Sequence, residues 1–160
     1  MPGCGKSTVG RHLARQLGMR FVDTDTDIEA RIGMPIRDYF AQLGEAAFRD
    51  VEQDVIEELT ALHGVVLATG GGAVLRPSNR DALHSRTHVF YLRATPEELH
   101  RRLREIYRER DPLYRRTAHF VVEAARPSVP AMLSMVLMQL EMAGLVDPGH
   151  VPSPIVPPQG

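Results

Sequence analysis

The first eight residues of the chain, MPGCGKST, contain most of a phosphate-binding loop. The full pattern, G-x-x-x-x-G-K-S/T, holds nucleotide phosphates on backbone N–H groups and lies between a strand and a helix. Its last three positions are Gly5, Lys6 and Ser7, whereas its first glycine would fall one position before Met1. In such a loop the lysine contacts β- and γ-phosphate oxygens and the hydroxyl binds Mg²⁺. The spacing therefore predicts a nucleotide-phosphate site formed by Gly3, Gly5, Lys6, Ser7 and Thr8.

Lysine usage supports this interpretation of the loop. The chain has 19 basic residues, and Lys6 is the single lysine among them. Chance alone would place that lysine at this position about once in 19, counting the basic positions of the chain. A flexible ammonium group can reach between phosphate oxygens in a way that the planar guanidinium of arginine cannot reproduce.

Acidic residues follow the first predicted strand in the stretch DTDTD, which places Asp23, Asp25 and Asp27 at its carboxyl end. Ligands of open α/β sheets bind at these ends. Strand alternation predicts that Asp23 and Asp25 point the same way, one toward Mg²⁺ through water and the other toward a substrate hydroxyl. The alternative is helix capping, for which Asp25 or Thr26 would serve.

Three consecutive glycines, residues 70–72, follow a second apolar run in the stretch TGGGAV. Glycine lets the backbone approach a ligand closely and leaves its N–H groups accessible. A plain turn needs one or two glycines, so the triplet favours a binding role.

The arginines are ambiguous when taken alone. Arg49 lies near Glu52, but an ordinary surface pair between Glu45 and Arg49 at i, i+4 explains the same residues. Arg110 lies in YRERDPLYR, whose arginines could simply form a solvated helix face.

The remaining pattern predicts an α/β domain in which strands alternate with helices around a parallel sheet. Strands are predicted at 20–25, 65–69, 88–92 and 119–123. Helices are predicted from the loop to Gly18, at 36–43 up to Gly44, at 45–63, from a cap at Thr95 with Pro96 and Glu98, and at 128–143. The apolar stripe of the helix at 45–63 is Phe48, Val51, Val55, Leu59 and Leu62.

The composition of the chain limits the classes of function that it can have. The chain has 160 residues, a net charge of -1 and one cysteine, Cys4. One cysteine excludes an intrachain disulfide and fits a reducing cytoplasm, and the near-zero charge argues against a nucleic-acid partner. No signal peptide or membrane-spanning run is found. We expect a monomeric domain at 1–146 and a proline-rich, disordered tail at 147–160.

Taken together, the segments PGCGKST, VDTD, IRDYF, FRDVE, TGGGAV and ERDPLY resemble shikimate kinase from Met1 to about Met142. The resemblance implies a P-loop, nucleoside-monophosphate-kinase-like fold, a three-layer sandwich with a five-stranded parallel sheet flanked by helices. It also implies transfer of the γ-phosphate of ATP to the 3-hydroxyl of shikimate with Mg²⁺, a step of aromatic amino acid and chorismate biosynthesis. The implied partners are shikimate and ATP, with neither nucleic acid nor membrane.

The resemblance also implies roles for individual residues on the nucleotide side. Lys6 and Ser7 match the phosphate and magnesium residues of the family, and Asp23 matches the acid near magnesium. Asp25 matches the acid that binds the substrate hydroxyls and acts as the base, while Arg102 matches the arginine beside adenine.

On the substrate side, Arg49 and Arg110 match two arginines that grip the carboxylate of shikimate. The backbone donors and apolar walls of the family's pocket are matched by Gly71, Gly72, Phe40 and Phe48.

Two features of the family pattern are missing from the sequence. The family has a central first strand before the loop, and a lid with an R-P-L-L stretch, whereas here Leu103 is followed directly by Arg104. We expect a shortened chain to turn over slowly and to be marginally stable, with an apolar segment ending in glycine encoded upstream. Two alternatives stay open: a kinase for another polyol acid such as gluconate, and a non-catalytic nucleotide-binding remnant.

Overall fold

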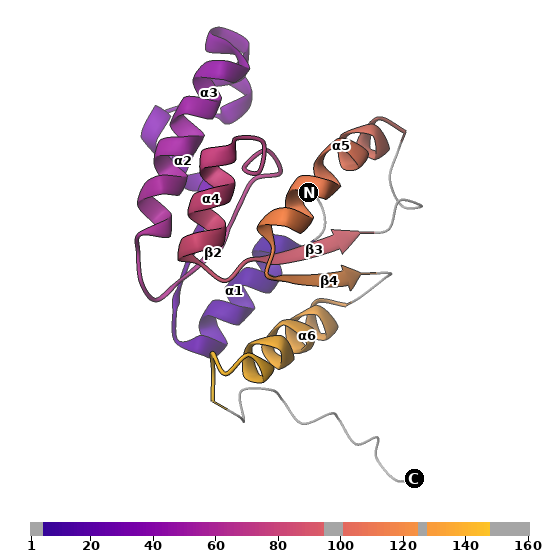
Figure 1. The fold of residues 1–160 in the computed structure, drawn as a ribbon. Helices are drawn as coiled ribbons and strands as arrows, with labels where there is room; N and C mark the ends of the chain where they lie inside the picture. Colours follow the sequence, from indigo (N-terminus) through magenta and orange to yellow (C-terminus); the bar gives the residue numbers. More distant parts are fainter. Residues whose placement is uncertain (1–4, 95–100, 125–127, 148–160) are drawn as a thin grey trace.

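The computed structural model describes residues 5–94, 101–124 and 128–147 (Figure 1). Strands alternate with helices along the described chain as predicted, except that two helices follow the first strand. The elements are α1 Lys6–Leu17, β1 Arg20–Asp23, α2 Thr24–Ile32, α3 Ile36–Thr60, β2 Val65–Ala68, α4 Pro77–Arg86, β3 Phe90–Ala94, α5 Arg101–Thr117, β4 Phe120–Ala124 and α6 Val129–Met142. Gly3, the predicted cap at 95–98 and the tail at 148–160 lie outside the described residues.

The strands form two parallel pairs. β1 pairs with β2, from Arg20 opposite Val65 to Asp23 opposite Ala68. β3 pairs with β4, from Phe90 opposite Phe120 to Ala94 opposite Ala124. Parallel pairing is confirmed, but the described residues do not form the five-stranded sheet that the family resemblance implies. Within them the two ladders are separate, because β2 and β3 share no backbone ladder.

Alternation along β3 divides its side chains between two helices. Phe90 and Leu92 pack with a core cluster formed by α1, β4 and α6, whose buried members are Leu13, Val122, Val136, Leu137 and Leu140. Tyr91 and Arg93 face the other way and contact α5. As Figure 1 shows, α5 and α6 therefore lie on opposite sides of the β3–β4 pair. Since Val66 of β2 packs against the same cluster, α1 joins the two strand pairs.

A second cluster, formed by Ile28, Phe48, Val55 and Leu59, packs α2 against α3. The predicted break in α3 is present, because Gly44 has φ 80 and ψ 176 and interrupts the helix there. The predicted stripe is confirmed at Phe48, Val55 and Leu59, but Leu62 is 43% exposed. The prediction that Leu62 belongs to the stripe was wrong, because α3 ends at Thr60, two residues before it.

Three element predictions need correction. The first strand ends at Asp23, because Thr24 already begins α2 and the chain turns there. Helix α4 was missed, although Pro77 at its first turn is a typical helix start. Helix α5 continues through Pro112 to Thr117, so the segment ERDPLY is helical. Among the described residues, no helix is both long and apolar enough to cross a membrane.

Candidate active site

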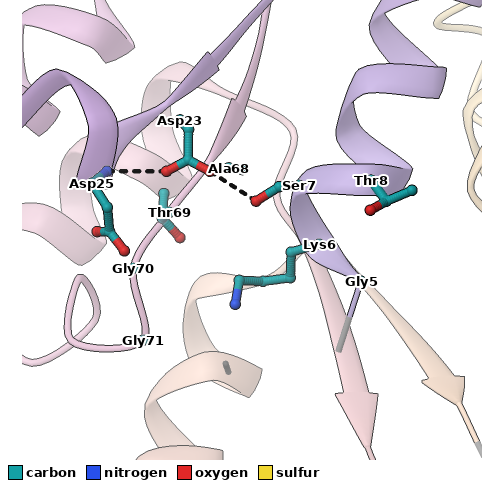
Figure 2. Close-up of a pocket in the computed structure, with 10 residues that line it drawn as sticks. All are labelled: Gly5, Lys6, Ser7, Thr8, Asp23, Asp25, Ala68, Thr69, Gly70 and Gly71. Atoms are coloured by element: carbon teal, nitrogen blue, oxygen red, sulfur yellow. Dashed lines mark hydrogen bonds between the residues drawn. The ribbon is translucent and has the colours of Figure 1, made fainter. Parts of the chain in front are cut away.

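A cavity of about 290 Å³ lies where α1 begins, β1 ends and the glycine triplet follows β2 (Figure 2). Residues from three of the predicted motifs line this cavity. Its lining residues are Gly5, Lys6, Ser7, Thr8, Asp23, Asp25, Ala68, Thr69, Gly70 and Gly71. The structure thus brings the phosphate loop, the acids and the glycines to one place, at the carboxyl ends of β1 and β2.

The phosphate loop ends at Gly5, which precedes α1 with φ 71. A left-handed conformation of this kind favours glycine, because it has no Cβ to clash. The N–H groups of the first turn of α1 have no partner in the helix, and together with its dipole they favour an anion. The side chain of Lys6 extends from this turn into the cavity, toward the glycine loop (Figure 2).

Asp23 connects the phosphate loop to the second acid. The Ser7 hydroxyl donates to Asp23 Oδ2 at 2.8 Å, and the backbone N–H of Asp25 donates to Asp23 Oδ1 at 3.1 Å. Asp23 is therefore the N-cap of α2, which corrects the alternative that Asp25 or Thr26 caps the helix.

The oxygens of Ser7 and Asp23 are hard ligands of the kind that Mg²⁺ prefers. The described ranges contain no group of three His, Cys, Asp or Glu side chains that could hold a metal ion. Mg²⁺ usually binds one or two protein oxygens and completes its shell with water and phosphate.

Asp25 lies in the first turn of α2 and not on the strand, so the predicted alternation with Asp23 was wrong. Desolvation raises the pKa of its carboxyl above the ordinary value of 3.8, and the neighbouring Asp23 adds to the rise, while Lys6 opposes it. The carboxyl touches Gly70, where an added Cβ would come within 2.6 Å of Oδ1. Asp25 thus lies between the phosphate loop and the glycine triplet.

Each glycine of the triplet meets a different side chain. Gly70 contacts the carboxylate of Asp25, and its N–H donates to the Thr24 hydroxyl at 3.2 Å. The carbonyl of Gly71 accepts from α5, and Gly72 lies against the guanidinium of Arg49, where a Cβ would overlap it. Close approaches therefore explain the glycines at positions 70 and 72, whereas the bonds at Gly71 use its backbone carbonyl.

Arg49 is part of a largely buried ion-pair cluster. Its guanidinium contacts Glu52 at 2.5 Å and Glu45 at 3.0 Å, with side-chain exposures of 12% for Arg49 and 2% for Glu52. The predicted Glu45–Arg49 pair is present, but the buried partner is Glu52. Burial raises the pKa of Glu52 even though Arg49 opposes the rise.

The two phenylalanines predicted as pocket walls surround this arginine. The rings of Phe40 and Phe48 lie 4.5 Å apart, and the guanidinium carbon of Arg49 is 5.8 Å and 5.0 Å from their centroids. Phe48 is only 3% exposed and belongs to the core, whereas Phe40 is partly buried. Neither ring lines the cavity described above.

Helix α5 contacts the triplet through Arg110 and Tyr114. Arg110 donates to the carbonyl of Gly71 at 3.0 Å, and the Tyr114 hydroxyl donates to the same oxygen at 2.5 Å. Sequence reasoning missed Tyr114, although its position four residues after Arg110 places both on one helix face. Arg102 lies in α5, in a turn whose side chains the structure does not describe.

Comparison with known proteins identifies the family. A family model for shikimate kinase matches residues 2–106. The chain belongs to the shikimate kinase family. A shikimate kinase of Ralstonia nicotianae is 49% identical over 170 residues, covering 95% of this chain and 90% of that protein. One of Paracidovorax citrulli is 52% identical, covering 92% of each.

Solved structures of shikimate kinases share the fold. That of Acinetobacter baumannii, in complex with shikimate, has a TM-score of 0.82 at 36% identity and covers 90% of each chain. That of Aquifex aeolicus has a TM-score of 0.81 at 27% identity, covering 91% of this chain and 95% of that one. The α/β kinase fold predicted from the sequence is therefore confirmed.

Proposed function

We propose that this chain transfers the γ-phosphoryl group of ATP to the 3-hydroxyl of shikimate in the presence of Mg²⁺. One observation carries the proposal: Lys6, Ser7 and Asp25 line a single cavity with Gly70 and Gly71, and Arg110 and Arg49 contact Gly71 and Gly72 of the same loop. The residues proposed to bind phosphate and the two arginines proposed to bind the carboxylate thus border the same glycine loop. Membership of the shikimate kinase family supports the same assignment.

The nucleotide side of the cavity provides positive charge and backbone donors. Gly3, Gly5 and the first turn of α1 would hold phosphate oxygens, and Lys6 would neutralise the charge that develops on the transferred group. Thr8, which lines the cavity, would add a hydroxyl donor. Arg102 is proposed to lie beside adenine.

Magnesium fits the hydroxyl of Ser7 and the carboxylate of Asp23, which already share a hydrogen bond. When bound, the ion neutralises charge on the β- and γ-phosphate oxygens. Asp23 also caps α2, so the same carboxylate holds the acid-bearing helix in place.

Asp25 is proposed as the base. The substrate hydroxyl oxygen forms a bond to the γ-phosphorus, the bond from that phosphorus to the bridging oxygen of ADP breaks, and the hydroxyl proton passes to the carboxylate of Asp25. A raised pKa suits this role, because a stronger base accepts the proton more readily.

Arg49 and Arg110 are proposed to bind the carboxylate of shikimate, since guanidinium groups recognise carboxylates with two parallel hydrogen bonds. Gly71 and Gly72 would offer backbone donors, and Phe40 with Phe48 would support the apolar side of the ring. Phe48 would act mainly through Arg49 and Phe40, because it is buried. We further propose that the protein acts as a monomeric domain in the cytoplasm, with 147–160 as a tail.

The test is a coupled assay of ADP release with ATP and Mg²⁺, in which shikimate and gluconate are compared. We expect release that depends on shikimate, with turnover below the range of about 1–100 s⁻¹ usual for kinases, because the lid motif is missing from the sequence. Release with gluconate alone would favour the polyol-acid alternative. Shikimate and ATP binding without turnover, measured by calorimetry, would favour a non-catalytic protein.

A further inference from the structure

The carbonyl of Gly71 accepts hydrogen bonds from two side chains of α5. Arg110 approaches it at 3.0 Å and the hydroxyl of Tyr114 at 2.5 Å. A carbonyl oxygen has two lone pairs, so both donors are accommodated. The loop that forms one wall of the cavity is therefore attached to a helix that lies about 40 residues further along the chain.

Holding this carbonyl also orients a donor. In a planar trans peptide the C=O of one residue and the N–H of the next point in opposite directions. The Gly71 carbonyl and the Gly72 N–H belong to one such peptide, and the described chain has no cis bond. When α5 holds the carbonyl, the N–H of Gly72 is turned away from α5. Gly72 also lies against Arg49, one of the proposed carboxylate-binding residues.

The two donors differ in whether they would also bind the substrate. Under the proposed function Arg110 binds the carboxylate of shikimate, so its bond to Gly71 must be shared or given up. The proposed function gives Tyr114 no part in binding the carboxylate. Its ring stacks on Tyr91 of β3 with centroids 4.9 Å apart and an angle of 20°. Tyr91 in turn donates to Asp111 at 3.0 Å, which ties the stack to α5.

We propose that Tyr114 is a positioning residue that holds the Gly71–Gly72 peptide, with the Gly72 N–H directed toward shikimate, while Arg110 engages the substrate. This inference rests on the proposed function. Tyr114 is not among the residues that line the cavity. It acts through the loop, so its loss should affect shikimate binding more than ATP binding or the stability of the fold.

The test compares Tyr114→Phe with Tyr91→Phe. Both variants keep the stacked rings and remove one hydroxyl, but only the first loses a bond to the glycine loop. For Tyr114→Phe we expect the KM for shikimate to rise about 2- to 10-fold, as for the loss of one neutral hydrogen bond. The KM for ATP should stay near that of the unaltered chain, and the melting temperature should fall no further than in Tyr91→Phe, which also loses one hydrogen bond. Tyr91→Phe should leave the KM for shikimate unchanged.

The proposal is overturned if Tyr114→Phe leaves the KM for shikimate unchanged, or if it raises both KM values together while lowering the melting temperature. A second measurement does not depend on turnover. In chain labelled with ¹⁵N-glycine, Tyr114→Phe should shift the amide resonance of Gly72 and speed its hydrogen exchange, whereas Tyr91→Phe should do neither. An unaltered Gly72 amide would also overturn the proposal, whereas absent shikimate turnover in the unaltered chain would count against the proposed function alone.

Discussion

The guanidinium of Arg49 occupies the space that the Cβ of any other residue would need at Gly72. This relationship joins α3 to the glycine loop and explains why position 72 is glycine. The Arg49 side chain has little freedom to move away from residue 72, because it forms ion pairs with Glu45 and Glu52 and is only 12% exposed.

Gly72→Ala should therefore displace Arg49, raise the KM for shikimate at least several-fold and destabilise the fold by about 1–3 kcal/mol, as overpacking does. Steady-state kinetics and urea unfolding measure the two effects. In an Arg49→Ala background the same glycine change should cost little, because the clashing group is gone. Fully additive effects in this double-mutant cycle would contradict the proposed clash.

Arg49→Ala should weaken shikimate far more than ATP, since its proposed ligand is the carboxylate of shikimate. It should also destabilise the fold by about 3–5 kcal/mol, because Glu52 would be left buried without its partner. Adding Glu52→Gln should recover much of the stability without recovering shikimate binding. Separate titrations of shikimate and ATP, with urea midpoints, test this. Equal, small effects on both ligands would leave Arg49 with a structural role only, as the partner of Glu52.

Lys6→Ala should abolish phosphoryl transfer, with a loss of at least about 100-fold in turnover, because the lysine works through charge at the transferred phosphate. Circular dichroism should show nearly unchanged structure, since the side chain extends into the cavity and not into the core. Lys6→Arg should not restore activity, because the planar guanidinium does not fit the same position. Turnover near that of the unaltered chain would refute the assignment of the loop.

Asp25→Asn should reduce turnover by about 10²- to 10⁴-fold, the usual contribution of a general base, with nucleotide affinity little changed. Since the carboxylate must be ionised to accept a proton, turnover should fall as pH falls through its pKa, which lies above the ordinary 3.8. The pH profile of the unaltered chain should show this acidic limb. A loss confined to ATP affinity would instead make Asp25 a metal or capping residue.

His119 should make the fold sensitive to acid at the amino-terminal ends of β3 and β4. The N–H of Val89 donates to its Nδ1 at 3.0 Å, which requires an unprotonated nitrogen. Its ring stacks on His84 at 4.3 Å and meets His88 edge-on at 5.8 Å. Desolvation first, and then these two histidines, lower the pKa of His119 below 6.5.

Because the pKa is lower in the folded chain, the unfolded chain takes up the proton first, and stability falls as pH drops below about 6.5. Above that pH the imidazole is neutral in both states and contributes no pH dependence. Urea midpoints between pH 7.5 and 5 should show the decline. It should be smaller in His119→Asn, whose amide oxygen can accept from Val89 without titrating. An identical pH dependence in that variant would contradict this role.

Local patterns determined much of the candidate site. The phosphate loop, the acids after the first strand and the glycine triplet were all read from residues a few positions apart. The same holds for the helix stops at Gly18 and the break at Gly44, since a left-handed backbone position is a property of the residue itself. Parallel pairing also followed from the order of strands and helices alone.

Only the tertiary structure decided which groups meet. Asp23 became the helix cap because the strand ends two residues earlier than predicted, and a cap depends on where the backbone changes direction. The contacts of Gly70 with Asp25, Gly71 with Tyr114 and Gly72 with Arg49 join segments far apart in the chain. No periodicity encodes such contacts, because they follow from how α2, α3 and α5 pack around the loop. The sequence therefore specified the chemistry of the site, and packing over long separations specified its geometry.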